Sequence, residues 1–148
     1  MEHAVHTLET MGIPNDVRIL SAHRTPEALS RYLRESEADG AEVFIGAAGG
    51  AAHLAGVMAA QTLKPVLGVP MESKLSGLDS LLSMVQMPAG IPVATFAVGK
   101  AGAVNAALFA AAILATQSPE IGRALTEFRQ AQSAKVLGDP DPRQPAPA

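Results

Sequence analysis

Two short stretches set the architecture of this chain: Ser21-Ala22-His23-Arg24-Thr25-Pro26 and Gly49-Gly50-Ala51-Ala52-His53-Leu54. Each follows an apolar run typical of a strand and precedes a helical pattern, which predicts a loop at the carboxyl end of a strand. Open α/β sheets bind their ligands at that edge. The first loop carries an imidazole, a guanidinium and hydroxyls, and the second carries unshielded backbone N–H groups. Together they predict a site for a small anionic substrate.

The composition limits the class of protein. At 148 residues the chain has the size of one domain, and its lack of cysteine excludes disulfides, thiolate metal sites and cysteine nucleophiles. The net charge is −3 without a lysine or arginine cluster, which argues against a nucleic acid or an anionic membrane surface as partner. No apolar run reaches the roughly 18 residues of a membrane span, and the start lacks the pattern of a secretory signal. We therefore expect a cytoplasmic protein.

The low charge content predicts self-association. Charged residues make up 17% of the chain, whereas globular domains average about 25%. Residues 101–115 form a helical pattern that is apolar on every side except at Asn105. A helix of this kind belongs in a protein interior or in an interface between copies.

Strand-like and helical patterns alternate along the chain. Strands are predicted at 17–20, 43–45, 66–69 and 93–98, and helices at 1–11, 26–39, 52–62, 78–85, 101–115 and 119–136. This order predicts a three-layer α/β fold, a parallel sheet with helices on both faces. Because the chain opens with a helix, a first strand and its phosphate-binding loop are expected to be missing. Residues 1–137 are predicted to form a single domain, and the proline-rich tail of residues 138–148 to be extended or disordered.

His23 is the first candidate for proton transfer. The reference pKa of histidine, about 6.5, suits the imidazole to donating and accepting protons near neutrality. A lone histidine on a turn is more often a surface residue, but the neighbouring Ser21, Arg24 and Thr25 favour the functional interpretation. Arg24 has the geometry to bind a phosphate or carboxylate with two hydrogen bonds, and pairing with Glu27 is an equal alternative.

Gly49 and Gly50 permit a close backbone approach, and the helix that follows adds partial positive charge for an anion. The alternative is that these glycines only let a helix and a strand pack. Their spacing differs from the dinucleotide fingerprint, so no nicotinamide cofactor is expected. His53 is expected to orient the loop through a hydrogen bond. His3 and His6 share a helix face without a third ligand nearby, so no metal site is expected.

Several motifs, in their order along residues 1–137, give the chain a resemblance to a known family. Besides the two opening stretches they are Pro65-Val66-Leu67-Gly68-Val69-Pro70, Leu75-Ser76-Gly77-Leu78-Asp79-Ser80-Leu81, Gln86-Met87-Pro88-Ala89-Gly90-Ile91-Pro92 and Gly99-Lys100-Ala101-Gly102-Ala103-Val104-Asn105-Ala106-Ala107-Leu108. The chain resembles the bacterial 5-(carboxyamino)imidazole ribonucleotide mutases of purine biosynthesis, which are class I members of the PurE family and have a flavodoxin-like fold.

The resemblance implies a cofactor-free isomerase. Such an enzyme moves a carboxylate from the exocyclic nitrogen of 5-(carboxyamino)imidazole ribonucleotide to the adjacent ring carbon, which gives 5-amino-4-carboxyimidazole ribonucleotide. It implies that His23 shuttles a proton while carbon dioxide leaves nitrogen and rejoins at carbon. It further implies substrate contacts from three groups of residues: Ser21, Ala22 and Arg24 on the nucleotide, Gly49, Gly50, Ala51 and Ala52 around the carbon dioxide, and His53 and Leu54 beside the reacting groups.

The resemblance also implies a homo-octamer with sites near subunit boundaries. Family members normally begin with a further strand and a glycine-serine-aspartate loop that holds the ribose phosphate, and this chain is expected to lack both. It also carries Ala47 and Ala55 where the family has glycine and proline, and its loop at residues 72–74 is one residue short. Two alternatives stay open: an aminoimidazole ribonucleotide carboxylase that uses carbon dioxide directly, and a subunit that assembles without turnover. The loop at residues 86–92 favours the mutase.

Overall fold

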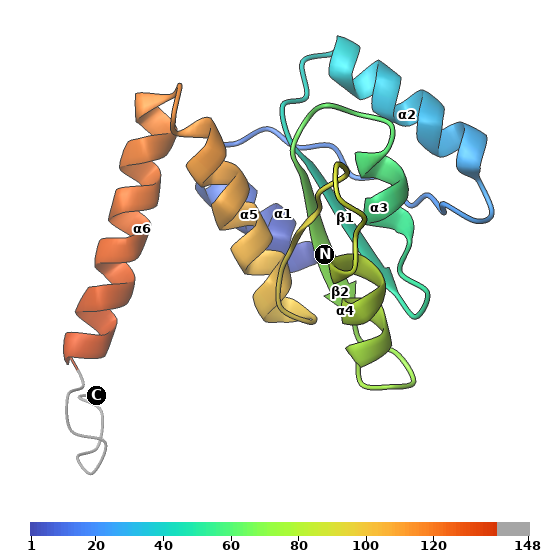
Figure 1. The fold of residues 1–148 in the computed structure, drawn as a ribbon. Helices are drawn as coiled ribbons and strands as arrows, with labels where there is room; N and C mark the ends of the chain where they lie inside the picture. Colours follow the sequence, from blue (N-terminus) through green and yellow to red (C-terminus); the bar gives the residue numbers. More distant parts are fainter. Residues whose placement is uncertain (139–148) are drawn as a thin grey trace.

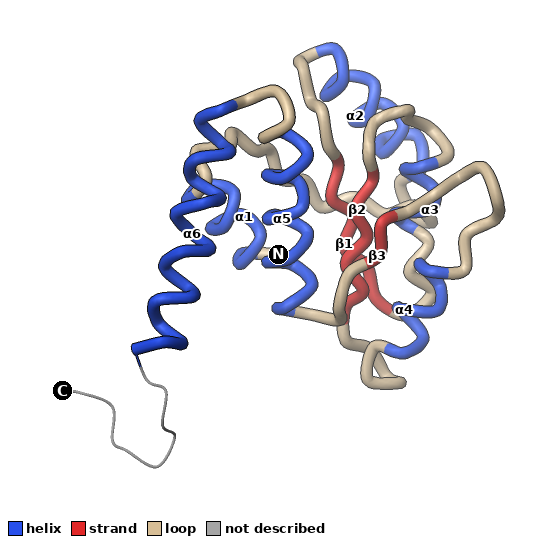
Figure 2. The backbone as a smooth tube through the Cα atoms, turned by 60° about the vertical axis from the view of Figure 1, so that its left-hand side comes forward, coloured by secondary structure: helices blue, strands red, loops and turns tan. Residues whose placement is uncertain are grey.

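The structure, a computed structural model that describes residues 1–138, is a three-stranded parallel sheet between two layers of helices (Figures 1 and 2). The strands are β1 (Phe44–Gly49), β2 (Val66–Met71) and β3 (Ala94–Thr95). The helices are α1 (Glu2–Thr10), α2 (Pro26–Ala38), α3 (Leu54–Ala59), α4 (Leu78–Val85), α5 (Lys100–Leu114) and α6 (Pro119–Gly138). The predicted three-layer α/β architecture is confirmed. The predicted tail lies outside the described residues, apart from Gly138, which ends α6.

The middle strand, β2, organises the sheet. β1 pairs with it along its full length, from Phe44 opposite Val66 to Gly49 opposite Met71, and β3 pairs with it through Ala94 and Thr95. All pairs are parallel, so the strands end at one edge of the sheet. Residues 66–70 are all buried, as expected for a short apolar strand covered on both faces.

One face of the sheet is covered by α5 and α1. Leu67 and Val69 of β2 share a buried cluster with Ala4 and Leu8 of α1 and with a run of small residues on α5: Ala103, Ala106, Ala107, Ala110 and Ala111. The helix predicted at 101–115 thus packs its small residues against this face of the sheet, while Asn105 and Phe109 stay exposed. Figure 1 shows α6 standing beyond α5, away from the sheet. Leu125 is the buried residue of α6.

The opposite face is covered by α2, α3 and α4 (Figure 2). Leu29 and Leu33 of α2 join Ala55 and Met58 of α3 in a second buried cluster. Close packing here depends on glycine in the strands. A Cβ atom placed on Gly68 would lie 2.9 Å from Val93 Cγ1 and 3.2 Å from Met84 Sδ.

The predicted strand at residues 17–20 is wrong. These residues form an extended segment without strand pairing, and Ile19 is fully exposed to solvent. A strand requires a neighbour for its backbone N–H and C=O groups, and within residues 1–138 no strand pairs with this segment. The apolar pattern of residues 17–20 alone cannot reveal whether such a neighbour exists.

The strand predicted at 93–98 is shorter than expected. Only Ala94 and Thr95 pair as a strand, although the N–H groups of Phe96 and Gly99 still bond to the carbonyls of Gly68 and Pro70. Pro70 has no N–H to return a hydrogen bond, which interrupts the regular ladder between β2 and β3.

We expect Gly102→Ala to destabilise the protein, because a Cβ atom there would lie 1.7 Å from the Ala97 carbonyl oxygen. Overpacking against backbone typically costs about 1–3 kcal/mol. Gly122→Ala is the matched control, since its Cβ atom would meet nothing closer than 3.9 Å. In the first turn of α6 alanine replaces a flexible glycine, so this variant should gain up to about 1 kcal/mol. Urea unfolding of both variants measures the difference, and equal stabilities would contradict this account.

Candidate active site

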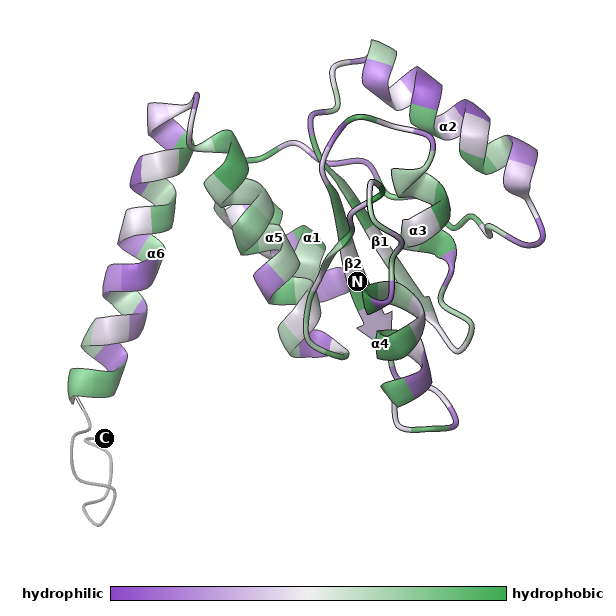
Figure 3. Ribbon diagram, viewed as in Figure 1, coloured by the Kyte–Doolittle hydropathy of each residue, from purple (hydrophilic) through white to green (hydrophobic). Residues whose placement is uncertain are grey.

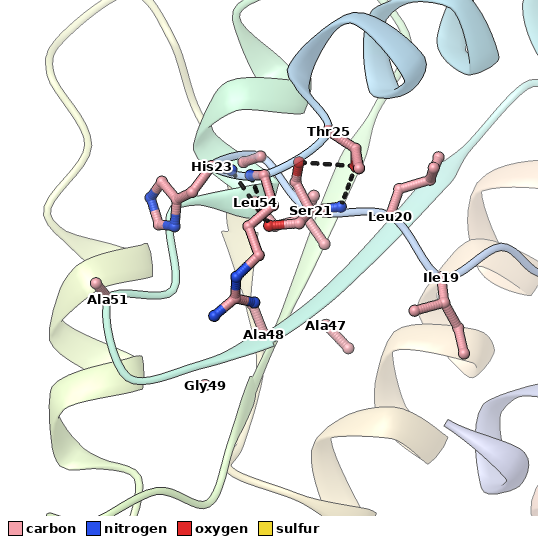
Figure 4. Close-up of a pocket in the computed structure, with 12 residues that line it drawn as sticks. Ile19, Leu20, Ser21, His23, Thr25, Ala47, Ala48, Gly49, Ala51 and Leu54 are labelled. Atoms are coloured by element: carbon pink, nitrogen blue, oxygen red, sulfur yellow. Dashed lines mark hydrogen bonds between the residues drawn. The ribbon is translucent and has the colours of Figure 1, made fainter.

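The two loops singled out by the sequence meet at one cavity, at the carboxyl end of β1 (Figure 4). Its volume is about 560 Å³, within the range of small-molecule sites. The lining residues come from the first loop and its approach, from the end of β1 and from the start of α3: Ile19, Leu20, Ser21, Ala22, His23, Arg24, Thr25, Ala47, Ala48, Gly49, Ala51 and Leu54. The cavity therefore lies where an open α/β sheet binds its ligand.

The first loop is held by its own hydroxyl groups. The Ser21 hydroxyl accepts hydrogen bonds from the backbone N–H groups of His23 and Arg24, at 3.3 and 3.1 Å. The Thr25 hydroxyl accepts from the Ser21 N–H at 2.8 Å and donates to the Ser21 carbonyl at 3.1 Å, bonds that are visible in Figure 4. Pro26 then starts α2 with the φ angle that a helix needs. These bonds fix the backbone from which the His23 and Arg24 side chains project.

His23 is in contact with a second histidine. Its Nε2 atom lies 2.9 Å from Nδ1 of His53, and the two rings meet edge to face at 84°. His53 occupies the N-cap position of α3 and is not among the residues that line the cavity, whereas His23 is. The structure therefore puts His23 on the cavity lining and His53 in contact with it outside that lining, and both side chains are exposed to solvent.

The second loop is anchored to α4 by two serines. The Gly50 N–H donates to the Ser80 hydroxyl at 2.9 Å, and Ser80 in turn donates to the Met71 carbonyl at 2.7 Å. The Ser83 hydroxyl donates to the Gly50 carbonyl at 3.2 Å. Gly50 has a φ of +71°, a conformation that strongly favours glycine. The turn is thus fixed both by its backbone conformation and by α4.

The loop at residues 72–77, which joins β2 to α4, is held by a hydrogen bond between a serine and an aspartate. The Ser73 hydroxyl lies 2.5 Å from both carboxylate oxygens of Asp79. This hydrogen bonding favours the charged form and lowers the pKa of Asp79 from its ordinary value. The contact is complete while the carboxylate is charged, and it weakens as the pH falls through that lowered pKa.

The structure gathers most of the predicted site residues around the cavity. Seven of the ten are on its lining, Ser21, Ala22, His23, Arg24, Gly49, Ala51 and Leu54, whereas Ala52 is fully buried and not among them. Gly50 and His53 adjoin it through the contacts given above. Within residues 1–138 the one ion pair joins Arg18 to Asp16. Arg24 is therefore not paired with Glu27, the alternative that the sequence left open.

Sequence reasoning missed Ser80 and Ser83. Their hydroxyl groups act on a loop that lies 30 and 33 residues earlier in the chain. The sequence does contain one signal for them: two serines three residues apart in a predicted helix lie on the same face of that helix, where both can contact one neighbouring loop.

Other kinds of site find no support in the described part of the chain. No group of three or more histidine, aspartate or glutamate residues there could hold a metal ion. Nor does that part of the chain contain a helix long and apolar enough to cross a membrane.

Comparison with known proteins identifies the family. Residues 1–135 match the family described as AIR carboxylase. The chain belongs to this family. It is 57% identical to the N5-carboxyaminoimidazole ribonucleotide mutase of Pseudomonas aeruginosa, over 97% of this chain and 88% of that protein. It is 54% identical to the mutase of Escherichia coli, over 97% of this chain and 85% of that protein.

Solved structures agree with this assignment to the AIR carboxylase family. The crystal structure of Treponema denticola PurE superimposes with a TM-score of 0.86 at 29% sequence identity, and the match covers 97% of this chain and 89% of that one. The resemblance that the sequence motifs indicated is confirmed, and so is the fold class.

We expect Ser80→Ala to destabilise the protein and loosen the Gly50 turn. Ser80 is completely buried, and its loss leaves the Gly50 N–H and the Met71 carbonyl without their partner, which typically costs about 1–3 kcal/mol. Ser83→Ala is the control, because the half-buried Ser83 hydroxyl divides its one proton between the Gly50 carbonyl at 3.2 Å and the Asp79 carbonyl of its own helix at 2.8 Å, so its loss should cost less. Urea unfolding gives the stabilities, and hydrogen exchange of the Gly50 amide reports the turn. Equal effects of the two substitutions would refute the assigned roles.

Proposed function

We propose that this chain is an N5-carboxyaminoimidazole ribonucleotide mutase, an isomerase of de novo purine biosynthesis. The observation that carries the proposal is the 57% identity to the Pseudomonas aeruginosa mutase over 97% of the chain. The cavity supports it, because His23 and Arg24 line the same space as the backbone of Gly49. The substrate is a phosphorylated ribonucleotide that also carries a carboxylate, and a site with a guanidinium and backbone N–H groups suits such an anion.

The proposed reaction needs one proton to move from carbon to nitrogen. Protonated His23 gives its proton to the exocyclic nitrogen as the nitrogen–carboxylate bond breaks and carbon dioxide is released. The ring carbon then attacks carbon dioxide, and neutral His23 removes the hydrogen from that carbon. The proton count is unchanged over the cycle, so the enzyme needs no external acid or base. An imidazole suits this role because its reference pKa, about 6.5, is close to neutrality.

The two loops have separate roles in this mechanism. Arg24 is unpaired among the described residues and is available to bind an anionic group of the nucleotide. Gly49 and Ala51 have small or no side chains and leave room beside His23 for carbon dioxide between its departure and return. Leu54 adds an apolar wall that suits an uncharged intermediate.

We also propose that the chain forms a homo-octamer with sites near subunit boundaries. Leu78, Leu82 and Val85 are half-exposed on one face of α4, and Phe109 of α5 is 47% exposed. Figure 3 shows α4 and α5 as largely hydrophobic helices, coloured green. Large apolar side chains exposed on helix faces on both sides of the sheet are typical of a chain that buries them against other copies. Because a phosphorylated substrate does not cross a membrane unaided, we place the enzyme in the cytoplasm, where purine nucleotides are made.

We expect His23→Asn to abolish isomerisation and preserve assembly. The loss of a general acid–base group typically lowers the rate by about 10²- to 10⁴-fold. The matched control is His6→Asn on the exposed face of α1, which should keep the unchanged rate. Steady-state turnover and size-exclusion chromatography measure the two properties. Undiminished turnover in His23→Asn would remove His23 from the mechanism.

A bicarbonate titration separates the mutase from the alternatives. At saturating 5-(carboxyamino)imidazole ribonucleotide, turnover by a mutase should be independent of added bicarbonate, because the carboxylate comes from the substrate itself. Dependence on bicarbonate, or turnover of aminoimidazole ribonucleotide alone with bicarbonate, would identify a carboxylase. An assembled protein that turns over neither substrate would be a non-catalytic subunit.

A further inference from the structure

We propose that His53 is a positioning residue that accepts a hydrogen bond from Nε2–H of His23, so that His23 exchanges protons with the substrate through Nδ1 alone. This inference rests on the proposed function, since it concerns the group that carries the proton there. It gives His53 a role through His23 and not through contact with the reacting atoms.

The first support is the geometry of the pair. The two facing nitrogens are 2.9 Å apart, which is a normal length for a hydrogen bond that involves nitrogen. His23 lies on the cavity lining and His53 does not. The bond therefore occupies Nε2 of His23 and leaves Nδ1 without a hydrogen-bond partner among the described residues.

The second support is that both histidines are held by backbone bonds. The Ser21 hydroxyl accepts from the His23 N–H. The His53 N–H donates to the Ala51 carbonyl at 2.8 Å, and the His53 carbonyl accepts the Val57 N–H at 2.9 Å as α3 begins. Because the two backbones are fixed independently, the rings meet without needing the substrate to bring them together.

The third support is proton counting, which decides the direction of the bond. Two facing nitrogens share one proton, so either His23 or His53 donates. If His53 donated, neutral His23 would carry its proton on Nδ1, and its lone pair on Nε2 would be blocked by His53. It could then accept a proton from the substrate only by breaking the pair.

With His23 as donor the cycle proceeds without such a break. Neutral His23 holds its proton on Nε2 and presents a lone pair on Nδ1. When Nδ1 takes the substrate proton, the imidazolium keeps the same bond to His53 Nδ1. A ring with a second nitrogen fixed by a partner keeps one tautomer and one orientation, as in other acid–base sites. His53 then stabilises both protonation states that the reaction needs.

Three substitutions of His53 test this role. The amide group of asparagine overlays Nδ1 of histidine, whereas that of glutamine extends farther, toward the position of Nε2. We expect His53→Asn to keep a kcat close to that of the unchanged protein, while His53→Ala and His53→Gln lose about 10- to 100-fold in kcat. The KM should change little in all three, because His53 is not on the cavity lining. A larger effect on KM than on kcat, or an unchanged kcat in His53→Ala, would overturn the proposal.

Nuclear magnetic resonance of the ¹⁵N-histidine-labelled full chain gives a readout independent of turnover. In its neutral form His23 should be the Nε2–H tautomer with a proton protected from exchange. That protected proton should persist in His53→Asn and disappear in His53→Ala. A His23 that carries its proton on Nδ1 would refute the pair as drawn. If the protected proton is present but the chain turns over no mutase substrate, the proposed function fails and the assignment of the hydrogen bond stands.

Discussion

The parallel pairing of β1 with β2 is the constraint on which the site depends. It brings Gly49 opposite Met71, and the Met71 carbonyl is the group to which Ser80 donates while accepting from Gly50. A shift of one residue would reverse the faces of every side chain in β1 and would separate these partners. The pairing is fixed because Leu67 and Val69 must face α5 while Val66 faces α3. The packing of the sheet thus determines where the second loop presents its backbone to the cavity.

Small residues make this arrangement possible and leave it little tolerance. Gly68 lets α4 approach the sheet, and the alanines of α5 do the same on the other face. Layers that approach this closely transmit displacement, since protein interiors are packed as densely as organic crystals. The positions of the two loops therefore depend on residues that have no chemistry of their own.

The sequence predicts the helices, the central strand and the residue types of the site, because periodicity and turn residues are local signals. Residues 66–69 form an uninterrupted apolar run, and the structure has a buried strand there. The segment at 17–20 carries a similar signal, yet whether it pairs depends on a neighbour that no local pattern encodes. The contacts from Ser80 to Gly50 and from His53 to His23 each span 30 residues, so their geometry follows from the assembled fold and not from spacing. The roles assigned to the individual site residues stay predictions.

The position of α6 has a consequence for how the molecule comes apart. Leu125 is the buried residue of this 20-residue helix, and Ile121, Ala124 and Phe128 add partial cover against the neighbouring cluster. Little apolar area holds the helix in place, whereas the sheet is covered on both faces. Segments with few buried contacts open at a lower free energy than the core, as separate cooperative units. The folded state is therefore a hierarchy, in which α6 opens at a lower free energy while the edge of the sheet that borders the cavity keeps its native order.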